Sequence, residues 1–211
     1  MALNIYLTGV GGQGIGLLAA VLVRAIDHAG IPVQSVDTHG LAQRGGTVVS
    51  HVRMGEAIHS PLIPENQAHI LLALEIHEAI RAVDRFGAPS ATLFYYRTRW
   101  QPLSTRLGKE IPIDWEDAQK ACAERGIRAV EVFQPDLPDA RMQNIALLAS
   151  LCVSGLLVGV QESHFLQAIE DLLAGRSLED NRQLFQRLVR TEKDPTIRTE
   201  RTKKTIRPTE G

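Results

Sequence analysis

The sequence is poor in the residues that several classes of protein require. The 211 residues include two cysteines, Cys122 and Cys152, too few for a disulfide framework or for an iron–sulfur cluster held by four thiolates. The formal net charge is −1, so the chain lacks the basic excess of a nucleic-acid-binding protein. Its first residues run directly into an apolar stretch without a basic region and cleavage site, which predicts a cytoplasmic protein.

The motifs of self-sufficient catalysis are missing as well. No G-x-S-x-G occurs, and Cys152 falls in an apolar run, where a thiol is expected to be inert. None of the seven histidines has the i, i+4 spacing of a helical metal pair, and no metal site is expected. His69 and His77 flank a predicted strand and are expected to be surface or packing residues. The sequence therefore predicts binding groups without a complete catalytic set.

The residues that are present indicate a globular α/β domain. The chain is 44% hydrophobic and 22% charged, which is sufficient for a sizeable core. Apolar runs and amphipathic segments alternate, which predicts an open, mostly parallel Rossmann-like sheet with helices on both faces. The domain is expected to span residues 1–190, followed by a charged tail at 191–211. Strands are expected at 4–10, 32–37, 68–74, 91–96 and 128–133, and helices at 15–29, 75–85, 115–125, 162–174 and 178–189.

A glycine-rich turn lies between the first strand and the first helix. Its sequence, G-V-G-G-Q-G, is typical of a dinucleotide-binding fold. In such a fold, the N-terminus of the helix that follows the turn attracts an anion. Asp37 closes the second strand, at the place of a ribose-binding acid. The alternative is that the glycines only pack the turn and bind no nucleotide. The candidate binding residues here are Gly9, Gly11, Gly12, Gln13, Gly14 and Asp37.

The polar segment at residues 38–55 is not required by a plain βαβ unit. It carries two histidines, two arginines and a glutamine around the pair Gly45–Gly46, and its second half alternates like a strand. We interpret it as a glycine-hinged loop running into a strand, suited to binding an anion. One face of that strand is expected to hold Val48, Ser50, Val52 and Met54, and the other Thr47, Val49, His51 and Arg53.

Together, the glycine turn, this polar segment and S-P-L-I-P-E at 60–65 resemble the gamma-type domain of the 2-oxoacid:ferredoxin oxidoreductases. The chain is most similar to the small (beta) subunits of the indolepyruvate ferredoxin oxidoreductases. The close match covers about residues 4–65, and the remainder to about residue 190 agrees in layout. Asp37 and Leu41 stand where the family has Glu and Met.

The resemblance implies a subunit that is inactive alone. Such complexes convert a 2-oxo acid and coenzyme A to acyl-CoA and CO2, using thiamine diphosphate and 4Fe-4S clusters that reduce ferredoxin or another electron acceptor. A large partner subunit is implied to carry these cofactors, none being bound by this chain alone. Arg44 is the preferred anion contact, because its guanidinium matches a carboxylate or phosphate; its alternative is a structural ion pair. The implied catalytic residues are His39, Arg44 and His51, and the implied binding residues of the segment are Thr38, Gln43, Gly45, Gly46 and Ser50.

Two other functions remain open: a free-standing nicotinamide- or flavin-dependent oxidoreductase, and a non-catalytic scaffold subunit. A separate question is the uncharged run at 142–161, which has the length of a membrane span. Its polar residues favour instead a helix at 144–160 buried in the core or against a partner, without contact with the membrane. The tail has few apolar residues and is predicted to be disordered alone or to lie across an acidic partner surface.

Overall fold

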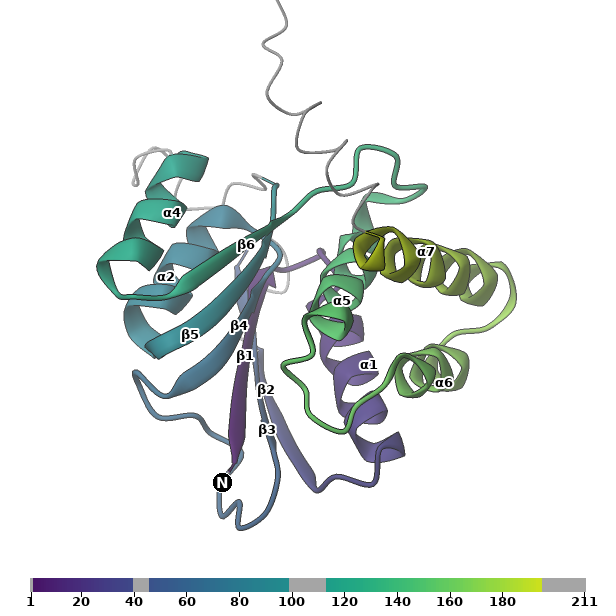
Figure 1. Cartoon of the computed structure of the whole chain (residues 1–211), viewed down its shortest axis with the longest axis horizontal. Coiled ribbons are helices and arrows are strands. Elements are labelled where there is room, and N and C mark those ends of the chain that lie inside the picture. The colour runs from purple at the N-terminus through teal and green to yellow at the C-terminus, as the bar shows by residue number, and fades with distance from the viewer. Residues whose placement is uncertain (1, 40–45, 99–112, 195–211) are drawn as a thin grey trace, which may run out of the picture.

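The computed structural model describes residues 2–39, 46–98 and 113–194 (Figure 1). Within them, one sheet has the strand order β2-β3-β1-β4-β5-β6. β3 is antiparallel to both of its neighbours, and the other adjacent pairs are parallel. The predicted open, mostly parallel sheet is therefore confirmed. The strands are β1 Leu3–Val10, β2 Val33–His39, β3 Thr47–Met54, β4 Ala68–Ala73, β5 Gly87–Tyr96 and β6 Arg128–Val132.

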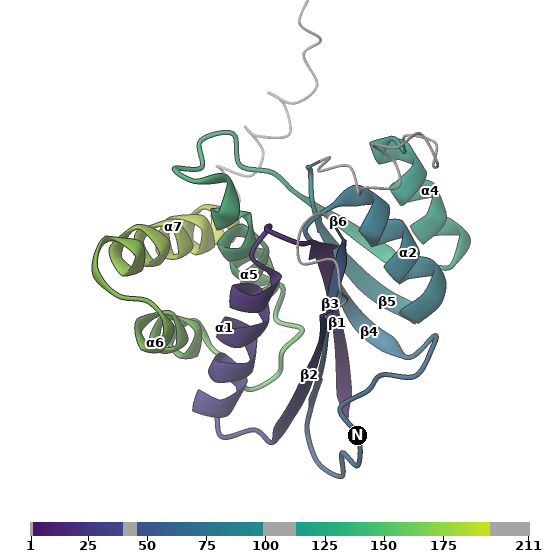
Figure 2. The ribbon, with the colours of Figure 1, turned by 180° about the vertical axis from the view of Figure 1, so that it is seen from behind.

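Helices cover both faces of this sheet, as predicted. α2 and α4 pack on one face, whereas α1 and α5 pack on the other, with α6 and α7 outside them (Figures 1 and 2). Apart from the apolar run at 142–161, each predicted element is found, although β5 begins at Gly87 rather than at residue 91 and α7 spans 175–193 rather than 178–189. The helices are α1 Ile15–His28, α2 Ile76–Phe86, α4 Trp115–Glu124, α5 Gln143–Ser154, α6 Glu162–Leu172 and α7 Gly175–Lys193, with a short 3-10 turn, η1, at Ala140–Met142.

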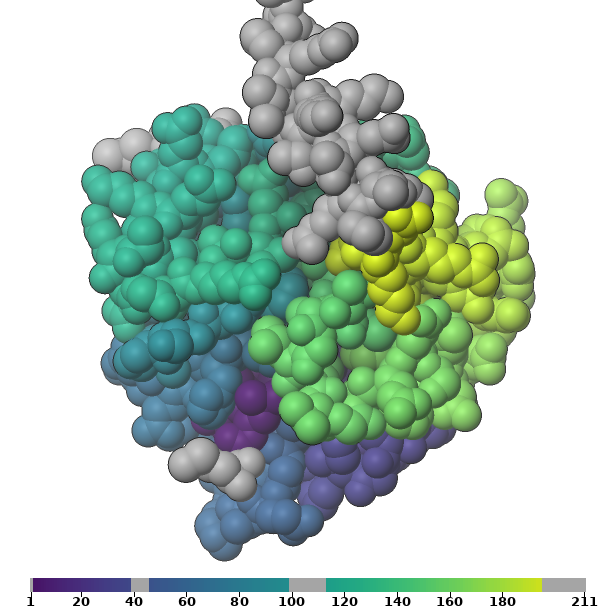
Figure 3. Space-filling view, in the orientation of Figure 1, coloured from purple at the N-terminus to yellow at the C-terminus, as the bar shows by residue number. Residues whose placement is uncertain are grey.

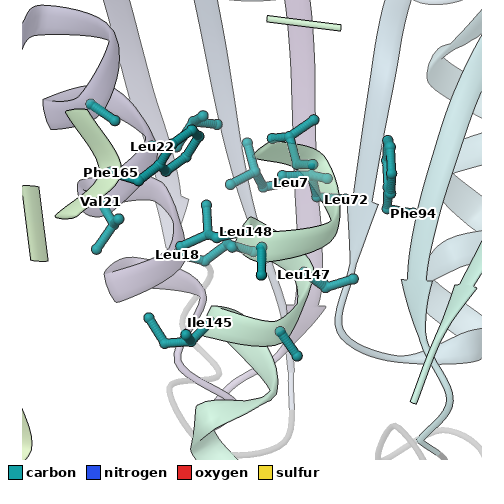
Figure 4. Packing of buried hydrophobic residues seen from close by; sticks show 14 of the residues in the cluster. Leu7, Leu18, Val21, Leu22, Leu72, Phe94, Ile145, Leu147, Leu148 and Phe165 are labelled. Atoms are coloured by element: carbon teal, nitrogen blue, oxygen red, sulfur yellow. The ribbon is translucent and has the colours of Figure 1, made fainter. Parts of the chain in front are cut away.

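Two hydrophobic cores follow from the alternation of side chains along the strands. Leu7 of β1 and Leu72 of β4 are fully buried and belong to the core beneath α1 and α5 (Figure 4). Tyr6 and Leu71, their neighbours in sequence, point into the core beneath α2 and α4. The central strands are thus apolar on both faces because both faces are covered.

The strand β3 divides its side chains between the same two cores. Val52 and Met54, with Val48 partly buried, pack beneath α1, whereas Val49 packs with the core beneath α2. The predicted assignment of these residues to opposite faces is confirmed.

The helix α5 is shorter than predicted. It ends at Ser154, because Gly155 adopts a left-handed conformation with φ of 69° and closes it. The expected continuation to residue 160 is wrong, and Val158 is 82% exposed. Burial of the first half in the core is confirmed, since Ile145 and Leu148 are inaccessible to solvent (Figure 4). Within the described ranges, no helix has both the length and the apolar character needed to cross a membrane.

The opening βαβ unit departs from a plain dinucleotide fold. There, the second strand would lie beside the first, but here β3 lies between β1 and β2. β3 begins at Thr47, too soon after His39 at the end of β2 for a parallel crossover, and it pairs antiparallel with both β2 and β1. The glycine turn and Asp37 are consequently one strand further apart than a plain dinucleotide fold would place them.

Candidate functional site

Three segments that are distant in sequence meet at the carboxyl end of the β1–β4 pair. From β1 the chain enters α1 on one face, and from β4 it enters α2 on the other (Figures 1 and 2). Open α/β sheets bind ligands at such a switch point. β3 also begins there, since Thr47 lies opposite Val10. We call this region, residues 8–14, 46–47 and 74–78, the switch edge.

The glycine turn is joined to the end of the polar segment. The N–H of Gly11 donates to the carbonyl of Gly46 at 2.9 Å. Gln13 locks the same turn onto the neighbouring strand: its Oε1 accepts from the N–H of Val10 at 2.8 Å, and its Nε2 donates to the carbonyl of Leu74 at 2.9 Å. Because Gln13 is buried and both ends of its amide are used, the geometry favours a positioning role over direct ligand binding.

Two of the predicted binding glycines are also needed for packing. A Cβ on Gly9 would lie 2.8 Å from Cδ1 of Ile15. Gly14 has φ of +87°, and a Cβ there would lie 2.9 Å from Nδ2 of Asn144 on α5. Gly12, with φ of +102°, is exposed, and a Cβ there would meet no described atom within 4 Å. The open side of the turn is therefore at Gly12.

Asp37 is exposed on the edge strand β2 and accepts a hydrogen bond from the hydroxyl of Ser50. Ser50 in turn lies opposite Leu7, three positions before the end of β1. Adjacent strands are about 4.8 Å apart, so Asp37 lies roughly 10 Å from β1 across the sheet. This position gives the proposed ribose contact no support and weakens the free-standing nicotinamide alternative.

His51 lies in the middle of the sheet, opposite Tyr6. It is buried, its Nδ1 accepts from the N–H of Ile63 at 3.1 Å, and its ring meets those of Tyr6 and Phe86 edge-on at 5.1 and 5.5 Å. Burial, and then the charge of Arg85, lower the pKa of His51 and keep the ring neutral. This position favours a packing role over the predicted catalytic one.

The first turn of α2 contributes residues that the sequence analysis did not select. Glu75 is inaccessible to solvent and accepts from the N–H groups of His77 and Glu78 at 2.7 and 3.2 Å. Its other oxygen lies 2.8 Å from Nδ1 of His77. Nε2 of His77 accepts from the N–H of Ile113 at 3.4 Å. His77 is thus a packing residue, as predicted, while His69 is exposed.

Glu78 is a second carboxylate buried at the switch edge. Its Oε1 accepts from the hydroxyl of Thr47 at 3.0 Å and from Arg81 at 2.7 Å, and its Oε2 accepts from the hydroxyl of Thr8 at 3.5 Å. Burial raises the pKa of Glu78, opposed by Arg81 and Thr47. Glu78 therefore ties the first residue of β3 to β1 and α2. The signal that would have found it is a pair of glutamates directly after a buried strand.

Part of the predicted site lies outside the described residues. This applies to Gln43, Arg44 and Gly45, and to the side chain of His39, whose backbone ends β2 opposite Val48. Thr38 is exposed on β2. Within the polar segment, His39 at the end of β2 and Gly46 just before β3 thus reach the same edge of the sheet as the glycine turn.

The two cysteine thiols are not part of the switch edge. Cys122 packs in the core beneath α2 and α4, and Cys152 packs against the core on the opposite face of the sheet. Burial raises the pKa of each thiol to about 11. Neither thiol is activated as a nucleophile, which agrees with the expectation for Cys152.

Comparison with known proteins gives matches over nearly the whole chain. The family model described as pyruvate ferredoxin/flavodoxin oxidoreductase matches residues 4–190. The indolepyruvate oxidoreductase subunit IorB of Archaeoglobus fulgidus is 49% identical over 81 residues, 38% of this chain and 40% of that relative. Its namesake from Methanothermobacter thermautotrophicus is 41% identical over 93 residues, 44% of this chain and 47% of the relative. The matched stretch thus spans less than half the length of either relative.

Solved structures with the same fold cover more of the chain at lower identity. The gamma subunit of a keto/oxoacid ferredoxin oxidoreductase from Geobacter sulfurreducens has a TM-score of 0.62 at 19% identity, covering 89% of this chain and 96% of that one. The 2-oxoglutarate:ferredoxin oxidoreductase from Magnetococcus marinus has a TM-score of 0.62 at 16% identity, covering 90% of this chain and 31% of that one. At these identities the likeness concerns the fold.

Proposed function

The chain belongs to the pyruvate ferredoxin/flavodoxin oxidoreductase family, and from that premise we propose that it is the small subunit of a 2-oxoacid:ferredoxin oxidoreductase complex. The complex would oxidise a 2-oxo acid with coenzyme A to acyl-CoA and CO2 and pass the electrons to ferredoxin or another acceptor. An aryl-2-oxo acid such as indolepyruvate is the proposed substrate, because the two relatives compared above carry that name.

The observation that carries this proposal is the hydrogen bond between Gly11 and Gly46. It joins two of the motifs on which the family resemblance rests, the glycine turn and the polar segment, into one feature at the switch edge. Glu78 stabilises this arrangement, because its carboxylate accepts a hydrogen bond from Thr47, the residue next to Gly46. The edge therefore offers a fixed base from which the polar segment reaches a neighbouring subunit.

The proposed cofactors fit a partner better than this chain. Thiamine diphosphate, when bound, stabilises the carbanion formed from the 2-oxo acid, and 4Fe-4S clusters carry the electrons. A cluster requires several thiolates together, but Cys122 and Cys152 lie on opposite faces of the sheet. The buried carboxylates Glu75 and Glu78 are already bonded within the chain, which leaves neither for a cofactor metal ion. We therefore assign both cofactors to a large partner subunit.

In this proposal the chain helps to bind and orient the substrate and coenzyme A. Arg44 is the proposed contact to the carboxylate of the substrate or a phosphate of coenzyme A, with Thr38, His39 and Gln43 beside it in the polar segment. The structure from Magnetococcus marinus is described with 2-oxoglutarate, coenzyme A and succinyl-CoA bound. A positive, hydrogen-bonding segment suits ligands of this kind.

We further propose that residues 1–190 act as one gamma-type domain and that residues 191–211 form a basic tail that docks on an acidic partner surface. α7 continues to Lys193, slightly beyond that boundary. The complex is proposed to be cytoplasmic and to bind neither membrane nor nucleic acid. Protease sensitivity after Arg190, compared with and without the partner, tests the docking of the tail, and equal sensitivity would contradict it.

The scaffold alternative makes the same contacts but assigns the polar segment to assembly alone. Co-expression with a large thiamine-diphosphate subunit, followed by co-purification and turnover assays of variants at Arg44, separates the two. Loss of turnover within an intact complex supports the proposed role. Loss of association with normal turnover of the remaining complex supports a scaffold.

A further inference from the structure

A second candidate site lies on the face of the sheet that carries α5 and α7. A cavity of about 400 Å³ opens between the strands β5 and β6 and the ends of these two helices. Figure 3 shows this side of the molecule, with teal residues beside the green residues that follow α5. The volume lies within the range of small-molecule sites, about 300–1,000 Å³. Nothing in the proposed function uses this cavity.

The residues that line the cavity include one arginine and two hydroxyl residues whose polar groups are not engaged elsewhere among the described residues. Arg128 is exposed, and in the part of the chain that the structure describes its guanidinium makes no hydrogen bond or ion pair. Thr92, opposite Arg128 on β5, is 8% exposed, and Ser150 on α5 is 6% exposed. Neither hydroxyl bonds to a protein group within the described ranges, yet no described side-chain polar atom that is fully buried lacks a partner. Both hydroxyls must therefore open onto the cavity that their residues line.

The remaining lining sets the chemistry of the ligand. Phe94, Val130, Val153 and Leu156 give one side of the cavity an apolar surface. A single guanidinium matches one carboxylate in a forked geometry, and hydroxyls donate to the same kind of oxygen. Glu131, which accepts hydrogen bonds from Tyr95 and Arg97, and Glu192 also line the cavity, and the two carboxylates disfavour a doubly charged phosphate more strongly than a single carboxylate. We propose that this cavity binds a small monocarboxylate with an apolar body.

This site is separate from the switch edge. Thr92 and Arg128 form the first aligned pair of β5 and β6, whereas Tyr96 and Val132, at the carboxyl end, form the last. Four residues of strand span roughly 13 Å. One element reaches both regions: Asn144, near the start of α5, donates to the carbonyl of Gly14 at 3.4 Å, and Ser150 lines the cavity. The proposal does not depend on the oxidoreductase function.

The test is a titration of the full chain labelled at Val and Leu methyl groups and followed by NMR. The probe is 3-phenylpropanoate, and 3-phenylpropan-1-ol serves as the matched compound without a carboxylate. We expect saturable shifts of the Val130, Val153 and Leu156 methyl signals with the acid and at least tenfold weaker binding of the alcohol. Arg128→Gln should weaken the acid at least tenfold, and Thr92→Val should weaken it severalfold. Arg176→Gln, at an exposed arginine outside the cavity, should leave binding unchanged.

Several results would overturn the proposal. Absence of saturable shifts at these methyl groups would show that the acid does not bind here, and equal binding of the alcohol would remove the role of Arg128. Tighter binding of inorganic phosphate than of the acid would show that the cavity prefers another class of ligand. Binding seen only after removal of residues 195–211 would show that the chain's own C-terminal segment is the occupant. Circular dichroism of each variant checks that the fold is retained.

Discussion

The N–H of Gly11 donates to the carbonyl of Gly46 across 2.9 Å, so the glycine turn after β1 and the residue before β3 form one feature. The two residues are far apart in sequence, and the antiparallel pairing of β3 with β1 brings them together. The glycine turn of this chain therefore supports the polar segment. That relationship distinguishes it from a plain dinucleotide site, in which the turn itself faces the ligand.

Gly14→Ala should destabilise the chain by about 1–2 kcal/mol, because the left-handed conformation disfavours a Cβ and the added atom meets Asn144. Gly16→Ala is the matched control two residues later, where a Cβ meets no described atom within 4 Å. In a helix this change should be neutral or stabilise by about 0.5–1 kcal/mol. Urea denaturation of both variants measures the difference. Equal stability of the two would contradict the packing role assigned to Gly14.

Glu78→Gln should change how stability depends on pH. Burial raises the pKa of Glu78, so its folded state favours the protonated form. The stabilising contribution is then complete below the unfolded pKa, near 4.5, and is lost as the pH rises through the folded value. At neutral pH the glutamine variant of the isolated chain should be at least as stable as the wild type. Thermal denaturation between pH 4 and 8 tests this, with the exposed Glu124→Gln as control.

The same variant should impair the assembled complex. If Glu78 positions Gly46 and Thr47 for the polar segment, Glu78→Gln should raise KM or lower kcat/KM even though the isolated chain is not destabilised. A purely structural residue would lose stability and activity together. Unchanged kinetics in an intact complex would remove the positioning role.

His51→Asn should retain an acceptor for the N–H of Ile63 but lose the ring contacts with Tyr6 and Phe86. We expect a loss of about 1–3 kcal/mol in the free energy of unfolding and an unchanged kcat of the folded complex. Because the pKa of His51 is lowered, its contribution is present above the unfolded value of 6.5 and is lost as the pH falls below it. The variant should lose that part of the pH dependence. A fall in kcat without a loss of stability would restore the catalytic assignment.

Arg44→Lys should raise KM or lower kcat/KM of the assembled complex. The change should correspond to about 1–3 kcal/mol of lost binding free energy, the cost of losing a charge-assisted, forked contact to an anion. Steady-state kinetics with the 2-oxo acid and coenzyme A varied in turn identify which ligand is contacted. Arg176→Lys, at an exposed position on α7, is the control. Normal kinetics with intact assembly would indicate a structural ion pair instead.

The sequence predicted the layers of the fold because each strand and most helices carry a regular apolar pattern. It did not predict the order of the strands near β1, because the position of β3 depends on tertiary pairing. The short connection between the two strands was the available signal for an antiparallel return, because a parallel crossover needs about a dozen residues or more. The helix predicted at 144–160 was too long because apolar character was given more weight than Gly155.

The sequence predicted the motifs of the candidate site but not the residues that position them. Glu75 and Glu78 follow the buried strand β4 closely, but the role of Glu78 depends on its contacts with Thr8 and Thr47, which are distant in sequence. Conversely, His51 and Asp37 have the sequence context of functional residues, but His51 points into a core and Asp37 lies on an edge strand. A polar side chain in a motif does not reveal by itself whether it bonds inward or outward.

The most direct test of the central claim is reduction of ferredoxin driven by indolepyruvate and coenzyme A, measured for this chain, for its large partner subunit and for the two co-expressed. We predict turnover by the complex and none by this chain alone, which should also lack the absorbance of an iron–sulfur protein. Turnover by the single purified chain, or a large subunit that is fully active without it, would contradict the account.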